Sequence, residues 1–200
     1  MTTSAVEICN MALSAVPARK IVSLNENTKT ARECRTHYPQ VIADLLETGE
    51  WSWATKRVRL TEFGGKKKDW RRAFQAPPDM GYPLRLLRSE FETGLHNGGG
   101  LLFDWEGNVF WAEEDEVWLE YVTNQPEYRA MTAKFRTALI ETLAARLVMP
   151  LTGNQQREQM LTNRAEVYRD RAVAADLNQN APQNTYGTDY FPDVLAYGHE

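Results

Sequence analysis

Apolar residues recur three and four positions apart near the N-terminus, which is the spacing of one face of a helix. Ser4 and Glu7 stand in the positions of a capping box, so we expect the first helix to begin there. The same spacing over 28–49 predicts a second helix, which Pro39 should kink or divide. These elements make an N-terminal helical region, residues 1–50.

The pattern then changes to an alternation of apolar and polar positions. The segment 51–61, with its two tryptophans, is predicted to be a strand, and 76–83 is rich in turn residues. Further strands are expected at 84–88, in a hairpin of 101–105 with 108–112, and at 116–122. Residues 51–125 are therefore expected to form a β-rich region with a small antiparallel sheet.

Helical spacing resumes at 131–149, and Pro150 is expected to end that helix. Residues 154–178 predict a long and largely polar helix. Such a helix either crosses solvent between two parts of a protein or packs against a partner outside its own chain. The sequence thus favours an α+β fold, a body of about four helices with a central small antiparallel β-sheet domain. Residues 126–181 complete the helical body, and 182–200 read as an extended C-terminal arm.

Composition narrows the class of protein. The 200 residues carry a formal net charge of −4, whereas a dedicated nucleic-acid binder normally has a basic excess. Cys9 and Cys34 are too few for a disulfide framework and are expected to be buried, reduced thiols. No apolar stretch reaches the ~20 residues that span a bilayer, and the first ten residues lack a signal-peptide pattern. We therefore expect the protein to fold in a reducing, aqueous compartment and not to associate with a membrane.

Two charged clusters are the candidate sites. The acidic one comprises Asp104, Glu106, Glu113, Glu114, Asp115 and Glu116. It can be a solvated loop, a carboxylate site for a divalent cation or catalysis, or a surface that repels nucleic acid. The basic one comprises Lys66, Lys67, Lys68, Arg71 and Arg72, with Trp70 among them. It can contact phosphates while the indole stacks on a base, or it can keep the protein soluble or dock on an acidic partner.

Motifs for catalysis are missing from the sequence. The three histidines lack metal-ligand spacing, the glycines at 98–100 are not followed by the residues of a phosphate loop, and no nucleophile lies in a recognisable setting. We expect neither an enzyme nor a cofactor or metal site.

Several short motifs, in order along the chain, resemble the tail tubular protein A family of short-tailed bacteriophages. They lie at 7–16, 21–25, 31–40, in Trp51-Ser-Trp-Ala-Thr-Lys-Arg57, in Ala76-Pro-Pro-Asp79, in Glu120-Tyr-Val-Thr123, at 135–147 and in Pro150-Leu-Thr-Gly153. Each motif is short, but their order and spacing cover about residues 5–180. The segment at Lys66–Asp69 and the C-terminal arm depart from the family pattern.

The resemblance implies a structural virion protein, a head-to-tail adaptor with a helical body and a β-rich domain. Members form a twelve-fold ring between the portal protein and the tail nozzle. The partners that the resemblance implies are other copies of the chain, the portal protein and the tubular protein B-like nozzle, with the tail fibres as a further candidate. Double-stranded DNA passes through the lumen without specific binding. On that basis the acidic cluster is the candidate channel lining, and Tyr186, Tyr190, Phe191 and Tyr197 form the candidate partner-docking arm. The alternative is a DNA-binding accessory protein that uses the basic cluster.

Overall fold

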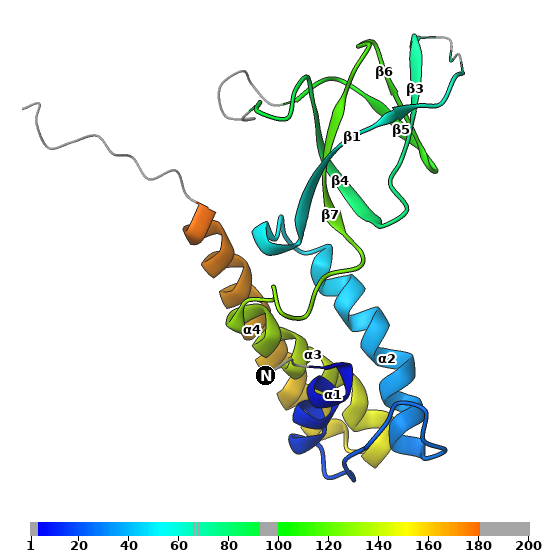
Figure 1. Ribbon diagram of the computed structural model, residues 1–200. Helices are drawn as coiled ribbons and strands as arrows, with labels where there is room; N and C mark the ends of the chain where they lie inside the picture. Colours follow the sequence, from blue (N-terminus) through cyan, green and yellow to red (C-terminus); the bar gives the residue numbers. More distant parts are fainter. Residues whose placement is uncertain (1–3, 66, 68, 93–99, 181–200) are drawn as a thin grey trace, which may run out of the picture.

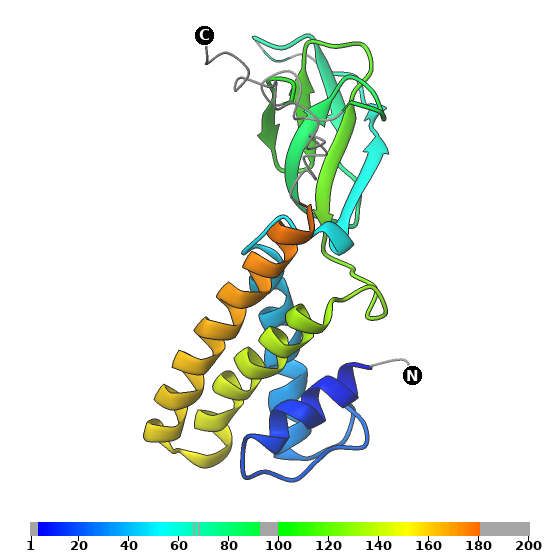
Figure 2. The same ribbon diagram turned by 90° about the vertical axis from the view of Figure 1, so that its left-hand side faces the viewer.

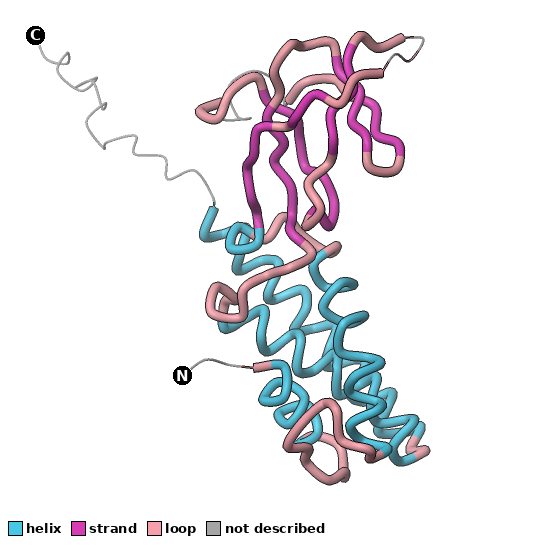
Figure 3. Tube along the Cα trace, turned by 45° about the vertical axis from the view of Figure 1, so that its right-hand side comes forward, coloured by secondary structure: helices cyan, strands magenta, loops and turns pink. Residues whose placement is uncertain are grey.

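The computed structural model describes residues 4–65, 67, 69–92 and 100–180, and it shows a helical body with a β domain at one end (Figures 1 and 2). The helices are α1 (Ala5–Ser14), α2 (Lys29–Leu46), α3 (Ala133–Thr152) and α4 (Gln155–Asn180). The middle of the chain forms the β domain, so the strands interrupt the helical body in sequence (Figure 3). The expected α+β arrangement is confirmed.

The described part of the β domain contains two antiparallel sheets rather than the one small sheet that the sequence predicted. The strands are β1 (Thr55–Arg59), β2 (Thr61–Glu62), β3 (Arg72–Gln75), β4 (Met80–Leu87), β5 (Asp104–Glu106), β6 (Val109–Ala112) and β7 (Trp118–Thr123). Their order is β1-β7-β4 in the first sheet and β2-β3-β6-β5 in the second. Leu60 separates β1 from β2 and is buried, and its N–H donates to Val117 O at 3.0 Å. This break carries the chain from one sheet to the other.

A separate apolar core holds the two sheets together. Phe74 and Phe110 from the second sheet and Leu119 and Tyr121 from β7 in the first are almost completely buried within it. Aromatic side chains of this size each remove a large apolar area from water, which stabilises a small sheet pair that helices do not cover.

In the helical body, α3 is the central element and packs against each of the other three helices. Phe135, Leu139 and Leu143 of α3 are completely buried. The expected capping box begins α1, because Glu7 N–H donates to Ser4 Oγ at 3.3 Å and Ser4 N–H donates to Glu7 Oε2 at 2.9 Å. Core packing of these apolar faces, rather than helix propensity, supplies most of the stability of such helices.

The two predictions based on helix-interrupting prolines have different outcomes. Pro39 does not divide α2, which is continuous, so of the two expected effects only a kink stays a prediction. The predicted end of α3 at Pro150 is wrong, because α3 runs on to Thr152. A proline removes one helical hydrogen bond, but packing on both sides of the position can outweigh that loss. The stop signal for α3 is Gly153, whose positive φ of 67° gives the left-handed cap that glycine adopts without strain.

The predicted strand over 51–61 begins four residues later than expected. Ser52–Ala54 form a single 3₁₀ turn, η1, and the strand starts at Thr55. Trp51 Nε1 donates to Leu45 O at 2.9 Å, and the rings of Trp51 and Trp53 lie 4.8 and 4.6 Å from the ring of Phe135. The two tryptophans therefore pack into the helical core instead of alternating along a strand.

The bend predicted for 76–83 is also shorter than expected, because β4 already begins at Met80 and contains Pro83. The pairing of β4 with β7 shifts register around Gly81 and again after Pro83. Such irregularities let a strand contain a proline, which cannot donate to the ladder.

Cys9 and Cys34 are completely buried free thiols, as predicted. They lie on α1 and α2. The hydrogen bond with Cys34, followed by burial, raises the pKa of the Cys9 thiol. No helix in the described part of the chain combines the length and the apolar character needed to cross a bilayer.

Candidate functional site

The six acidic residues singled out in the sequence lie on the β domain. Asp104 and Glu106 belong to β5, and Glu113 to Glu116 form the connection between β6 and β7. Asp104 and Glu106 point to the same side of β5 because they are two residues apart in a strand.

Each of these acids has a basic partner, so the two clusters that the sequence treated separately are one structure. We call this set the distal ion-pair cluster. Its pairs are Lys67 with Asp104 and with Glu106, Arg71 with Glu113, Arg88 with Glu114, Arg72 with Asp115 and Arg59 with Glu116. Arg59 and Arg88 come from elements that the sequence did not assign to the basic cluster. Lys66 and Lys68 lie outside the described residues.

Lys67 pairs with two of the six acids in this cluster. Its Nζ donates to Glu106 Oε1 at 2.7 Å and also to Asp104 Oδ2. The hydrogen bonds that Lys67 donates to Asp104 and Glu106 raise the pKa of Lys67, and the one to Asp104 lowers the pKa of that carboxyl group. Both groups are therefore charged at neutral pH, and their charges largely cancel at a distance.

This pairing bears on the two functions suggested for the clusters. Lys67, Arg71 and Arg72 already have carboxylate partners, and a phosphate would have to compete with them. The acids, in turn, do not converge on a common point. Among the described residues no group of three or more His, Cys, Asp or Glu side chains could hold a metal ion.

Within the described part of the chain, the helical body carries exposed cations without a carboxylate partner. Five of them lie in the α1–α2 connection and the first half of α2: Arg19, Lys20, Lys29, Arg32 and Arg35. A cation in the first turn of a helix opposes the helix dipole, so this placement does not stabilise α2. The sequence analysis did not single out these residues, although their spacing on one part of α2 was readable.

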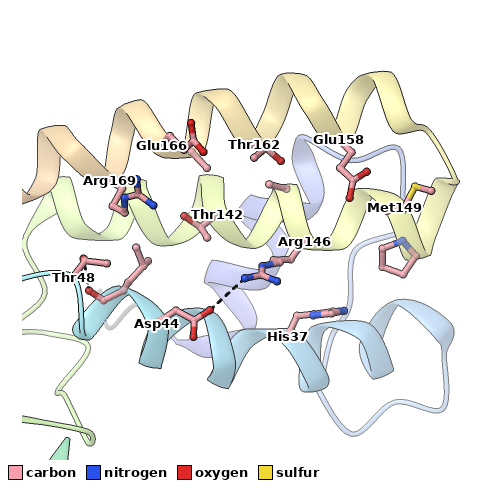
Figure 4. Close-up of a pocket in the computed structure, with 14 residues that line it drawn as sticks. His37, Asp44, Thr48, Thr142, Arg146, Met149, Glu158, Thr162, Glu166 and Arg169 are labelled. Carbon is pink, nitrogen blue, oxygen red and sulfur yellow. Dashed lines mark hydrogen bonds and ion pairs between the residues drawn. The ribbon is translucent and has the colours of Figure 1, made fainter. Parts of the chain in front are cut away.

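A groove lies on the helical body. It has a volume of about 750 Å³ and runs along α3, with α2 and α4 as its walls (Figure 4). Thr142 and Ala145 of α3 lie along its floor, and α1 packs behind α3, away from the viewer. Figure 4 shows Asp44 of α2 facing Arg146 of α3, and their Oδ2 and Nη2 atoms are 3.4 Å apart.

The groove walls combine polar and charged groups. Glu158 and Glu166 of α4 line it, and neither has an ionic partner among the described residues. His37 of α2 also lines it and lies 3.5 Å from Glu33. The lining has no nucleophile paired with a base. Its mixture of polar and charged groups is better suited to contact with another protein surface than to binding a small substrate. The groove could not be read from the sequence, because only the packing of α2 and α4 on either side of α3 creates it.

Comparison with protein-family models and with curated proteins gives no match for this chain.

Proposed function

We propose that this chain is a structural virion protein, the head-to-tail adaptor of a short-tailed bacteriophage. Copies of it form a closed ring, twelve-fold as the resemblance implies, between the portal and the tail nozzle, and DNA passes through the lumen. Assembly takes place in the host cytoplasm. The proposal rests on the resemblance described above and on where its motifs lie in the fold.

The observation that carries the proposal is that three motifs, far apart in sequence, meet where the body joins the β domain. Thr55 of the first motif pairs with Val122 of the third in the β1–β7 ladder. Tyr121 Oη donates to Asp79 Oδ1 at 2.8 Å, and Thr123 Oγ1 donates to the Asp79 carbonyl oxygen at 3.0 Å. The residues that carry the resemblance are therefore those that set this two-part architecture.

The adaptor role also fits the charge distribution. An adaptor has to let DNA slide through its lumen. Cations that are already paired with acids bind phosphates weakly, so a surface of such pairs does not hold the DNA. The distal ion-pair cluster is such a surface, and we assign it to the lumen. The alternative of a DNA-binding accessory protein gains no support from the described members of the basic cluster, because each is ion-paired.

The test is the native mass by light scattering across protein concentration and salt, with particle images of any large species. A ring of about a dozen copies with a central hole supports the proposal, since closed symmetry is the defining property of such adaptors. If the isolated chain is a monomer, binding to a purified portal ring decides. A monomer that binds duplex DNA but no portal ring would contradict the adaptor function.

A further inference from the structure

Besides the groove, the helical body has a second face without a partner in the described chain. Met160, Val167, Ala174 and Leu177 of α4 are exposed, and we call them the α4 stripe. Their spacings of seven and three residues place them along one side of the helix. Met160, Val167 and Leu177 expose 54%, 46% and 60% of their surface, so a row of large apolar side chains faces away from the core of the described chain.

The α4 stripe and the groove lie on different sides of the same helix. At 100° per residue, Met160 and Val167 are about 100° to 160° around the axis from the groove residues Thr162 and Glu166. The core residue Leu161 faces α3 between these two sides. One copy therefore presents a ridge on one side and a groove on the other.

We propose that the α4 stripe of one copy lies in the α2–α3–α4 groove of the next copy in the ring. This inference rests on the proposed function, because it gives the adaptor ring its subunit interface. The side chains of Met160 and Val167 are the ridge, and the small residues Thr142 and Ala145 on the floor leave room for them.

The dimensions agree for copies that stand side by side at one level. Met160 and Val167 are about 10 Å apart along the helix axis, at 1.5 Å per residue. The groove residues of α4 extend from Glu158 to Arg169, about 16 Å by the same rise. Both stripe residues therefore fall within the length of the groove without a shift of one copy along the other.

The charges of the two faces are complementary. The groove offers Glu158 and Glu166, which have no ionic partner in the described chain. Next to the stripe, Arg171 is exposed and has no carboxylate partner there, and its guanidinium lies 5.6 Å from the ring centroid of Tyr168. In copies at one level, Arg171 lies about 8 Å along the axis from Glu166, within reach of its long side chain, whereas Glu158 is about 20 Å away. Contact between two copies would therefore pair Arg171 with Glu166 at the edge of the apolar ridge, the usual arrangement of a protein interface.

The placement of the two faces also determines the symmetry. Because the ridge and the groove are different surfaces, their contact is heterologous, and each copy keeps one free face of each kind. Contacts of this type continue from copy to copy and give a closed ring when the rotation between copies closes.

Disulfide cross-linking tests the interface directly. The variant carries Val167→Cys on the stripe and Thr142→Cys on the groove floor. These positions point to different sides of the body, so they meet only between copies. Oxidation with diamide should give a ladder of dimers, trimers and larger species, which a reducing agent collapses. Each single variant and the parent chain, whose Cys9 and Cys34 are buried, are the controls.

A mixing experiment tests the direction of the contact. Met160→Glu with Val167→Glu removes the ridge and leaves the groove, whereas Thr142→Trp fills the groove and leaves the ridge. Each variant alone should stay monomeric, and an equimolar mixture should give heterodimers but no ring. Urea unfolding of each variant shows that it is folded.

The outcomes separate the interface from the function. Rings of the parent chain without a cross-linked ladder, or a ladder that stops at dimers, overturn the interface and leave the adaptor function standing. A full ladder whose particles are open filaments supports the interface and counts against the adaptor. If the parent chain is monomeric and the double-cysteine variant gives no ladder at its highest soluble concentration, the interface is overturned as well.

Discussion

Asp176, near the end of α4, accepts two hydrogen bonds from Ser52, from the backbone N–H at 3.0 Å and from Oγ at 2.9 Å. The two residues are 124 positions apart, and Asp176 is 5% exposed. Ser52 begins η1, the turn that leads into the β domain. A single carboxylate thus fixes the last helix to the point where the chain leaves the helical body.

Removal of that carboxylate should loosen the junction. Asp176→Ala leaves the Ser52 N–H and hydroxyl without their buried acceptor, and we expect a loss of about 2–3 kcal/mol in the free energy of unfolding. Urea unfolding measures the loss, and hydrogen exchange at residues 52–55 should become faster. Asp176→Asn keeps one acceptor oxygen and should lose less. Equal stability of the alanine variant and the parent chain would show that the contact does not stabilise the junction.

Asp79 should make the stability of the β domain depend on pH. Burial raises its pKa, but hydrogen bonds from Lys56, Tyr121 and Thr123 and the charge of Lys56 more than offset this, so the pKa is lowered below its ordinary value. A carboxyl group with a lowered pKa stabilises the fold above its ordinary pKa, and the contribution is lost as the pH falls through the folded-state pKa.

We therefore expect Asp79→Ala to cost about 1–3 kcal/mol at pH 7, because the buried Tyr121 hydroxyl loses its acceptor. The difference from the parent chain should shrink below about pH 4. Urea unfolding at both pH values measures it. Lys56→Met is the matched control, since it removes only an ion pair whose lysine is half exposed. A deficit that stays constant from pH 7 to pH 3 would contradict the account.

Neutralisation of the acids in the distal ion-pair cluster should create an affinity for DNA. The variant changes Asp104 and Asp115 to Asn, and Glu106, Glu113, Glu114 and Glu116 to Gln. It leaves Lys67, Arg59 and Arg71 without a carboxylate partner, whereas Arg72 keeps Glu62 and Arg88 keeps Glu92. Binding to a labelled duplex should then weaken with salt, with a log–log slope of about −3 if the three released cations contact phosphates. Fluorescence anisotropy at two salt concentrations measures this.

The same variant should slow DNA ejection from assembled particles if the cluster lines the lumen. Glu47→Gln, an exposed acid on the helical body, is the control and should change neither property. Unchanged ejection in the presence of increased DNA affinity would place the cluster outside the lumen. Unchanged affinity would mean that the acids do not mask the cations.

The two thiols should resist modification in the folded protein. Cys9 and Cys34 are completely buried, and the raised pKa of Cys9 keeps its thiol protonated. We expect reaction with a disulfide reagent at pH 8 to follow the rate of unfolding, with both thiols accessible only in concentrated guanidinium chloride. Rapid labelling of either thiol under native conditions would show that α1 separates from α2 more readily than its packing indicates.

Local signals in the sequence were sufficient for most elements. The capping box at Ser4 and Glu7 and the apolar spacing of the four helices depend on residues close together in the chain, and the structure confirms them. The hairpin is present too, but its first strand is Asp104–Glu106 instead of 101–105, and its turn lies at Gly107 and Asn108. The same local rules misjudged Pro150 and Trp51. In both cases tertiary packing outweighed the local preference, because α3 is held on several sides and the indole finds its partners in another element.

The candidate site shows the limit more clearly. From the sequence alone, Lys67 belonged to a basic cluster and Asp104 to an acidic one, 37 residues away. Two opposite charges cancel only when they lie close together in space. The pairing of β3 with β6 and of β6 with β5 brings Lys67 and Asp104 together, and no local sequence pattern predicts that pairing. The C-terminal arm, including Tyr186, Tyr190, Phe191 and Tyr197, lies outside the described residues, and its docking role stays a prediction.

Hydrophobic periodicity, which acts over a few residues, was sufficient to predict the α+β class, the order of the two helical segments around the β domain and the burial of the two thiols. The presence of two sheets, the mutual neutralisation of the charged clusters and the groove between α2, α3 and α4 became visible only in the packed fold. These properties arise where segments that are distant in the sequence meet. The distances between such segments depend on tertiary packing and not on their positions in the chain.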